Sequence, residues 1–254
     1  MRRKNRGWKL LFLAVALLYL VPVAMTVLKS FRYGDSAITL RQYVELLITD
    51  YTVLRYFWNS MFYAVSVTVV CLCVSFPLGF LFAKVKFFGR DALFFVYIVV
   101  MLLPFQATLL PNYIGLRDMK LLNTPYALML PMMFSPLAVF LFRQCIAGVE
   151  DSVLEYTMLE TNSVFQLLRY VVLPQTKEAF LTLGILIFCE SWNMVEQAMI
   201  FAAKNEEIWP LSVMLGQIPG DVTYAGATVY MYPVLVLFLC FRNVFSKSME
   251  KFKW

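Results

Sequence analysis

The sequence contains no histidine, and only 15% of its 254 residues are charged. The absence of histidine excludes catalysis that depends on an imidazole acid or base. The scarcity of charge argues against a soluble fold, since soluble domains contain about 25% charged residues. No GxxxxGK[ST] phosphate loop occurs, so the chain itself is not expected to bind ATP. We predict neither a catalytic site nor a cofactor.

Cysteine is scarce as well, and all five cysteines lie in or at the ends of apolar runs: Cys71, Cys73, Cys145, Cys189 and Cys240. Cys71 and Cys73 are two positions apart, so on a helix they point to different faces and are not expected to chelate a metal together. We interpret all five as small buried apolar residues. Neither a disulfide framework nor a metal site is indicated.

Apolar sequence is abundant, at 61% of the chain against about 45–50% in soluble domains. Apolar runs of about 20 residues recur, and a helix of that length crosses a hydrocarbon core of about 30 Å. The first run continues to about Leu28 without a clear cleavage site, so we interpret it as a retained span rather than a signal peptide. The sequence predicts an all-α membrane protein with a single transmembrane domain, residues 1–254, and six spans at about 8–28, 59–83, 92–116, 124–147, 178–202 and 227–246.

Lysine and arginine lie between the apolar runs, where they orient a membrane protein. With the N-terminus inside, fifteen of them fall on the cytoplasmic side and seven outside, so both termini are predicted to be cytoplasmic. The net charge of +6 does not indicate nucleic-acid binding, because no basic stripe is interleaved with exposed aromatic residues. The longest outer stretch, 29–58, contains a patch from Ile38 to Ile48 that fits either strand or helix.

The loop at about 148–177, between the fourth and fifth spans, is the most informative segment. Ser152-Val-Leu-Glu155 fits a helix capping box, and Ser163-Val-Phe-Gln166 fits the same pattern. Two short helices are expected, with the left-handed turn between them at Asn162. Acidic residues at the front and apolar residues behind suit docking to another protein. A solvated helix on the membrane surface is the alternative interpretation of the same spacing.

The same loop resembles the EAA motif of ABC importer permeases, which runs Glu-Ala-Ala, two residues, Asp-Gly-Ala, and a hydrophobic stretch to Leu-Pro. Four positions match in register, with Glu160 in place of Asp. Tyr156 and Thr157 replace the alanines, and Thr161 replaces the glycine. Leu173-Pro174 is expected to end the second helix. The resemblance assigns ATPase coupling to Glu155, Tyr156, Glu160, Thr161, Asn162, Leu173 and Pro174.

Shorter matches extend over nearly the whole chain and narrow the resemblance to the maltose-type, carbohydrate-uptake branch. Each match is weak alone, and their order and spacing carry the argument. They are Val21-Pro22, Lys29-Ser30-Phe31, Thr39-Leu40-Arg41-Gln42-Tyr43, Asn59-Ser60, Leu121-Leu122-Asn123-Thr124, Phe142-Arg143-Gln144, Trp192-Asn193, and Ala225-Gly226-Ala227 with Pro233.

The resemblance implies a type I ABC importer permease fold in a bacterial inner membrane, surrounded by lipid. It implies that a cytoplasmic coupling helix docks on an ATPase dimer, that a second, homologous permease completes the pathway, and that an extracytoplasmic binding protein delivers the solute. An oligosaccharide or related glycan fragment is the expected solute class.

Polar residues inside a span are functional candidates, because charged groups are costly in lipid. The fifth span carries Glu190, Asn193, Glu196 and Gln197. Helical spacing predicts that Glu190, Asn193 and Gln197 share one face, with Glu196 beside Asn193. This stripe is predicted to line the translocation pathway, and Gln106 of the third span is a weaker candidate.

Two other interpretations of the fifth span remain open. A protonated Glu190 could act as a hydrogen bond between helices, and Trp192 with Asn193 could pack the interface between permeases. Two functions of other classes also remain open: a proton-coupled secondary transporter that uses Glu190 or Glu196, and a non-transporting membrane scaffold.

Overall fold

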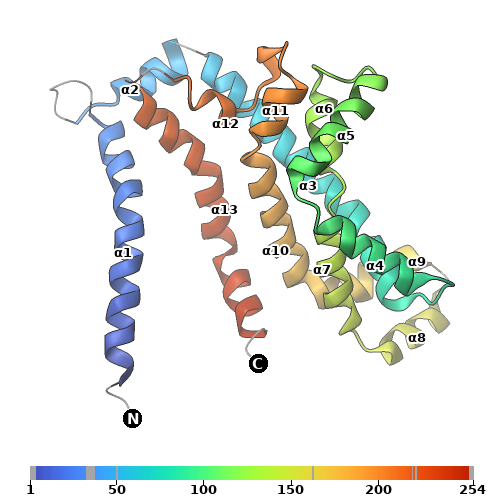
Figure 1. Cartoon of the computed structure of the whole chain (residues 1–254). Coiled ribbons are helices and arrows are strands. Elements are labelled where there is room, and N and C mark those ends of the chain that lie inside the picture. Colours follow the sequence, from blue (N-terminus) through green and yellow to red (C-terminus); the bar gives the residue numbers. More distant parts are fainter. Residues whose placement is uncertain are drawn as a thin grey trace.

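The computed structural model describes residues 4–32, 38–49, 51–161, 163–218, 220 and 222–251, and within these ranges every regular element is helical (Figure 1). The predicted all-α class is therefore confirmed. Both the start of α1 and the end of α13 lie at the same end of the molecule as α8 (Figure 1). In chain order the elements are α1 Lys4–Ser30, α2 Arg41–Val44, a π-helix Glu45–Thr49, α3 Thr52–Lys84, α4 Arg90–Met101, α5 Phe105–Asp118, α6 Pro125–Met129, a 3-10 turn Leu130–Met132, α7 Pro136–Ala147, α8 Asp151–Glu160, α9 Val164–Leu167, a π-helix Leu168–Val172, α10 Leu173–Trp192, α11 Glu196–Phe201, a 3-10 turn Glu206–Ile208, α12 Leu211–Met214 and α13 Thr223–Lys251.

Four helical stretches are long and apolar enough to cross a membrane: Thr52–Lys84, Pro125–Ala147, Val164–Trp192 and Thr223–Arg242. A fifth span is obtained if α4 and α5 count as one broken helix. The apolar part of α1, Ala14–Ser30, is shorter than this length criterion requires. Four or five of the six predicted spans therefore have the composition of a membrane helix, and the crossing by α1 stays a prediction.

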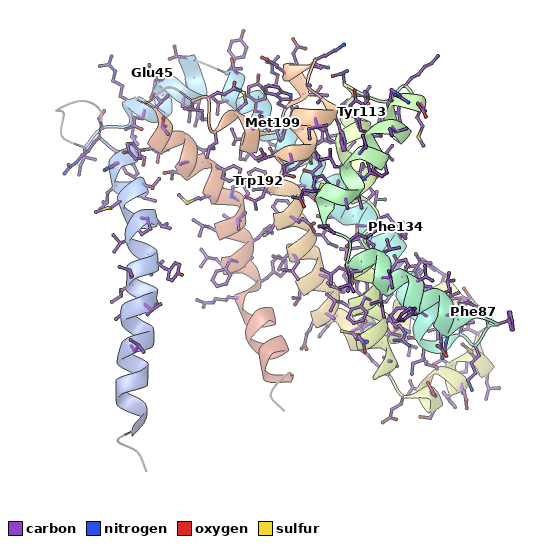
Figure 2. The ribbon with its side chains drawn as sticks, in the orientation of Figure 1. Glu45, Phe87, Tyr113, Phe134, Trp192 and Met199 are labelled. Carbon is purple, nitrogen blue, oxygen red and sulfur yellow. The ribbon has the colours of Figure 1, made fainter. Side chains whose placement is uncertain are left out.

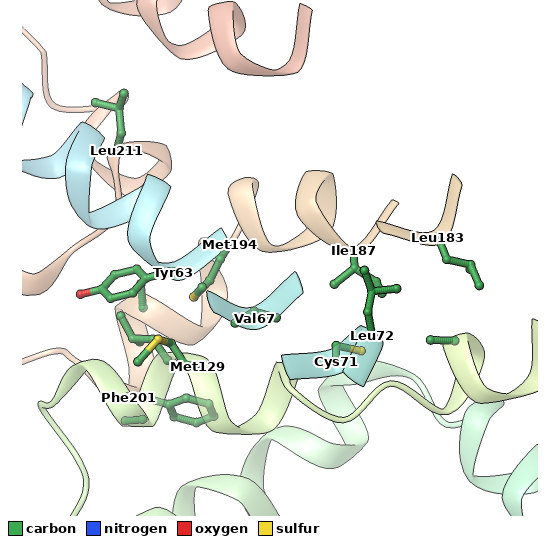
Figure 3. Close-up of a cluster of buried hydrophobic side chains, with 14 of the residues drawn as sticks. Tyr63, Val67, Cys71, Leu72, Met129, Leu183, Ile187, Met194, Phe201 and Leu211 are labelled. Atoms are coloured by element: carbon green, nitrogen blue, oxygen red, sulfur yellow. The ribbon is translucent and has the colours of Figure 1, made fainter. Parts of the chain in front are cut away.

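The centre of the bundle is α3, which packs against α7 and α10. Its buried face carries Tyr63, Val67 and Cys71. In Figure 3, Cys71 and Leu72 lie beside Ile187 of α10, and Tyr63 lies farther along α3. As the spacing predicted, Cys71 is buried and Cys73 is exposed. Of the other cysteines, Cys145 and Cys189 are half-buried and Cys240 is exposed, so burial of all five was wrong.

The crossing of α3 and α7 depends on a glycine. A Cβ placed on Gly79 would lie 2.5 Å from Cβ of Phe142 and 3.1 Å from the backbone N of Arg143. Next to this contact, the ring of Phe142 lies 5.3 Å from that of Phe76 and 5.7 Å from that of Phe180, which brings α3, α7 and α10 together. The small residue therefore allows the two backbones to approach, as is usual where membrane helices pack tightly.

The third, fourth and fifth predicted spans are interrupted, and the fourth breaks at residues 133–135, before α7. Pro104 and Pro111 indicated a break in the third span, whereas the expected continuous form of the fourth and fifth is wrong. The third span bends by 99° between α4 and α5, where Pro104 has an extended conformation and no N–H to donate. The fifth span ends at Trp192 and resumes at Glu196, because Asn193 leaves the helical conformation. The predicted alignment of Glu190, Asn193 and Gln197 on one helical face is therefore wrong too.

The expected stop at Leu173-Pro174 is also wrong. Helical structure runs without a break from Val164 to Trp192, and Pro174 lies in the first turn of α10. The π-helix Leu168–Val172 comes immediately before the proline. A wider turn at that position accommodates a residue that cannot donate a backbone hydrogen bond, which is a common reason for a local π-helix.

From Arg41 onward the patch from Ile38 to Ile48 is helical, and it connects α1 to α13 at the end of the molecule opposite α8 (Figure 1). Gln42 is 2% exposed, and its side chain makes the hydrogen bonds that connect α1 to α13. Its Nε2 donates to the carbonyl oxygens of Lys29, at 2.9 Å, and of Arg32, and its Oε1 accepts from the backbone N of Ala225 at 3.2 Å. Below this connection α1 leaves most of its apolar side chains exposed, with Leu18 at 71%.

Candidate functional site

The helix that the sequence singled out, α8, lies at one end of the bundle (Figure 1). It begins at Asp151, with Glu150 as its N-cap and no side-chain capping hydrogen bond. The predicted capping box at Ser152 is therefore wrong. Ser152 lies inside the helix, where its hydroxyl donates to Oε2 of Glu150 at 3.4 Å. The helix starts earlier than expected because Lys84 of α3 binds its first residue, Asp151.

The second predicted cap is confirmed. Oγ of Ser163 accepts from the backbone N of Gln166 at 3.4 Å and starts α9. The Gln166 side chain accepts from the hydroxyl of Thr161 instead of returning to Ser163. Thr161 is extended, with φ −141°, so the position that resembles the motif glycine needs no positive φ. The turn predicted at Asn162 lies outside the described residues.

The outer surface of α8 is apolar as well as acidic. Leu154 is buried and anchors the helix, whereas Tyr156 is 66% exposed and Leu159 is 87% exposed. Glu155 and Glu160 are also exposed. A large aliphatic side chain this exposed, beyond the bundle and between carboxylates, is typical of a surface that another protein covers.

Two further positions assigned by the motif, Leu173 and Pro174, lie at the start of α10 and not on α8. Leu173 is half-buried, and Pro174 is exposed behind the π-helix. A small hollow of ≈ 180 Å³ lies between α8 and α9, lined by Met158, Thr161, Ser163, Val164 and Leu167. The two short helices therefore form one surface.

Lys84, the last residue of α3, fixes this surface to the bundle. Its Nζ donates to the carbonyl oxygens of Ala147 and Val149, at 3.3 and 2.5 Å, and lies 2.7 Å from Oδ1 of Asp151. The Lys84 side chain is only 11% exposed. The hydrogen bond from Lys84, together with its positive charge, holds the pKa of Asp151 below its ordinary value. Sequence analysis missed Lys84, because it lies 67 positions from Asp151.

Replacing Lys84 with methionine is expected to weaken the hold on α8 about tenfold, because charge-assisted hydrogen bonds are lost while the aliphatic stem stays. The measurement is hydrogen exchange of residues 150–160 in the assembled protein. The matched control, Asp151→Asn, keeps both carbonyl contacts and should have a smaller effect. Because the pKa of Asp151 is lowered, the ion pair is complete above the ordinary aspartate pKa of about 3.9 and is lost as the pH falls through the lowered value. Equal exchange in the two variants at neutral pH would contradict this role.

The second candidate site is a hollow of ≈ 150 Å³ within the bundle. The breaks described above create it, since its walls come from the start of α5, the junction of α6 and α7, the end of α10 and the start of α11. Phe134, labelled in Figure 2, lies in the wall between α6 and α7. Its polar lining residues are Thr108, Asn112, Ser135, Glu190, Ser191 and Gln197.

The structure brings together only two of the predicted pathway residues, Glu190 and Gln197. Gln106 and Glu196 are exposed outside this hollow. The sequence analysis missed Thr108, Asn112, Ser135 and Ser191. The prolines at 104, 111, 131 and 136 were the available signal, because broken helices in membrane proteins are found where the backbone lines a cavity or is buried in protein.

Asn193 ends α10 instead of lining the hollow. Its Nδ2 donates to the carbonyl oxygen of Cys189 at 2.7 Å, and its Oδ1 accepts from the hydroxyl of Tyr230 at 2.6 Å. Trp192, labelled in Figure 2, is fully buried and stacks on Tyr230 with ring centroids 5.6 Å apart. Its Nε1 donates to the carbonyl oxygen of Tyr230 at 3.2 Å. This pair therefore packs α10 against α13 of the same chain.

Within the described ranges, no three His, Cys, Asp or Glu side chains are grouped to hold a metal ion. The two candidate sites are an exposed apolar and acidic surface at one end and a polar hollow inside the bundle.

Comparison with known proteins gives consistent results. The family described as "Binding-protein-dependent transport system inner membrane component" matches residues 75–251. The arabinooligosaccharides transport system permease proteins AraQ of Bacillus subtilis and Halalkalibacterium halodurans are 25% and 23% identical, and these alignments cover 94% and 92% of this chain and 92% and 90% of the relatives. The sn-glycerol-3-phosphate permease UgpE of Brucella abortus is 27% identical over 63% of this chain and 52% of its own length.

A solved structure has the same fold. A chain of a bacterial ABC transporter involved in the import of the acidic polysaccharide alginate superposes with a TM-score of 0.83, at 19% identity, over 96% of this chain and 98% of that one. At this identity the match concerns the fold alone.

Proposed function

Because the chain belongs to the family of inner membrane components of binding-protein-dependent transport systems, we propose that it is a carbohydrate-importing permease driven by ATP hydrolysis in a partner subunit. The chain is a multi-pass permease subunit of an ABC importer and is not itself the catalyst. The relatives named for arabinooligosaccharides match nearly the whole chain and support an oligosaccharide as the solute.

The observation that carries the proposal is the exposed surface of α8. Leu159 is 87% exposed although Leu154, five positions earlier and on another face of the helix, is 4% exposed. Lys84 holds the start of the helix to α3. A rigid helix that is anchored on one face and open on the other can transmit a push from a docked ATPase into the bundle. We therefore assign coupling to Glu155, Tyr156, Leu159 and Glu160.

The same proposal includes three further partners. A second permease is supported by α1, whose apolar residues are left exposed by this chain. An ATPase dimer would dock at α8, and an extracytoplasmic binding protein would deliver solute at the opposite end. We propose that the end with α8 and both termini faces the cytoplasm, because lysine and arginine are more frequent on that side.

The hollow containing Glu190 and Gln197 is proposed as part of the translocation pathway. It lies at the breaks of three spans, where small changes in helix angle would open or close it. Secondary transporters also place sites at broken helices, so the breaks do not separate the two classes. The family match favours an ABC importer permease over a secondary transporter or a scaffold.

The test is uptake into sealed vesicles that contain the complete assembly with its binding protein. We expect that uptake of the oligosaccharide retained by that binding protein requires ATP on the α8 side and continues when an uncoupler collapses the proton gradient. Uptake that stops with the uncoupler and ignores ATP would overturn the proposal. Absence of uptake by the full assembly would favour a scaffold.

A further inference from the structure

The polar hollow has an unusual charge balance. Among the described residues that line it, Glu190 is the only ionisable one, and the other polar side chains are neutral amides and hydroxyls. The side chain of Glu190 is exposed in the single chain, so it is open to the hollow rather than enclosed by packing. The salt bridges found in the described part of the chain involve other residues, at Arg55, Lys84, Arg90 and Arg117.

The other polar groups suit hydroxyl-rich molecules. The hydroxyl of Thr108 donates to a backbone carbonyl oxygen at 2.9 Å, and Oγ of Ser135 accepts from the backbone N of Ala138. Each keeps acceptor capacity after these bonds. Asn112 and Gln197 add amides that can both donate and accept. These groups can bind an uncharged sugar in many orientations, but they supply no positive charge.

We propose that Glu190 makes this pathway selective against negatively charged solutes. The cargo is then an uncharged or cationic saccharide, and uronides, sulfates and phosphate esters are rejected. This inference rests on the proposed function and narrows its substrate class.

The size of the effect follows from Coulomb's law. Two like unit charges about 4 Å apart disfavour each other about fivefold in bulk water and about a thousandfold at the effective dielectric constant of a protein surface. A hydroxyl at the same place instead donates to the carboxylate. One side chain therefore suffices to distinguish a neutral sugar from its acidic counterpart.

The comparisons show why a local side chain is needed for this discrimination. A chain with the same fold belongs to a transporter involved in the import of an acidic polysaccharide, and UgpE relatives are named for sn-glycerol-3-phosphate. Relatives named for arabinooligosaccharides, whose arabinose units carry no charge, are also similar. The fold thus occurs with anionic and neutral cargo, so the fold alone does not set the charge preference of the pathway.

The direct test measures the electrostatic potential in the hollow with two reagents of opposite charge. In the assembled transporter, with the native cysteines replaced, Thr108→Cys is reacted with trimethylammonioethyl methanethiosulfonate and with sulfonatoethyl methanethiosulfonate. Each forms a mixed disulfide and releases methanesulfinate. Gln106→Cys on the same helix, outside the hollow, is the matched control.

We expect the cationic reagent to be favoured at position 108, and Glu190→Gln to reduce that preference about tenfold at position 108 while leaving position 106 unchanged. An unchanged preference, an equal change at both positions, or no reaction at position 108 would overturn the inference. A second measurement needs no variant: the solute eluted from the co-purified binding protein is weighed by mass spectrometry, and an anionic solute also overturns it. Either failure leaves ATP-driven uptake intact, so it is distinguishable from failure of the proposed function.

Discussion

Replacing Glu155 and Glu160 together with lysine is expected to reduce retention of the ATPase by the purified permease at least a hundredfold and to abolish ATP-driven uptake. Both carboxylates are exposed on α8, on either side of the exposed Tyr156 and Leu159. Losing one partner of a charge pair at a protein interface costs about 2–5 kcal/mol, and reversal adds repulsion. The measurement is co-purification of the ATPase, followed by its hydrolysis rate in the presence of loaded binding protein.

The fold should survive this change. Substitutions at exposed positions away from special features usually alter stability by about 0.5 kcal/mol or less. The variant is therefore expected to insert into the membrane and to unfold at the wild-type temperature. The matched control reverses Glu206 and Glu207, another pair of exposed acidic residues, located in the turn after α11. That control should retain the ATPase, and full retention in the α8 variant would remove α8 from the coupling interface.

Replacing Gly79 with leucine should have the largest effect on stability. Even a Cβ at this position would lie 2.5 Å from Cβ of Phe142 and 3.1 Å from a backbone nitrogen, so relief requires α3 and α7 to separate. Overpacking of this kind costs about 1–3 kcal/mol and sometimes more. For a chain of this size each kcal/mol lowers the unfolding temperature by about 2–4 °C. We expect a Tm about 5–10 °C lower in detergent, and a reduced yield of assembled transporter.

The loss of stability should depend on where the glycine lies, so replacing a glycine that has free space around it should not lower Tm. Gly115 of α5 has no atom within 4 Å of an added Cβ. Gly115→Ala is therefore the control, and it is expected to leave Tm unchanged or to raise it slightly, since alanine favours helix by about 0.5–1 kcal/mol. A Gly79→Leu protein with wild-type Tm would show that the α3–α7 crossing is wider than described.

In the segment 148–177, local sequence patterns predicted the structure where the interactions are local. The Ser163 cap joins residues three positions apart, and its pattern in the sequence is enough to locate it. The Ser152 cap failed because Lys84, distant in sequence, positions the start of α8. The predicted helix end at Pro174 was wrong for a different reason. A π-helix directly before it accommodates the proline, which cannot donate a backbone hydrogen bond, and the sequence pattern does not predict that turn.

The polar hollow also shows that local sequence patterns are predictive and that contacts between distant residues are not predicted. Intramembrane charge made Glu190 a candidate, and that argument needs only the cost of placing a carboxylate in lipid. Its companions were misjudged because they were sought along one continuous helix. In the structure α10 ends at Asn193, held by Tyr230 of α13, and the hollow is completed by Thr108 and Ser135 from other helices.

The sequence by itself determined that this chain is a bundle of apolar helices in a membrane, and it predicted a cytoplasmic segment that resembles the EAA motif. Hydropathy, motif register and the absence of a phosphate loop are properties of the chain read in order, so no contact between distant residues is needed to see them. Only the tertiary structure decided where the fifth span breaks, which of Glu190, Asn193, Glu196 and Gln197 face a common space, and what holds α8 in place. These outcomes depend on contacts between residues far apart in sequence, and side-chain spacing along a single helix contains no information about them.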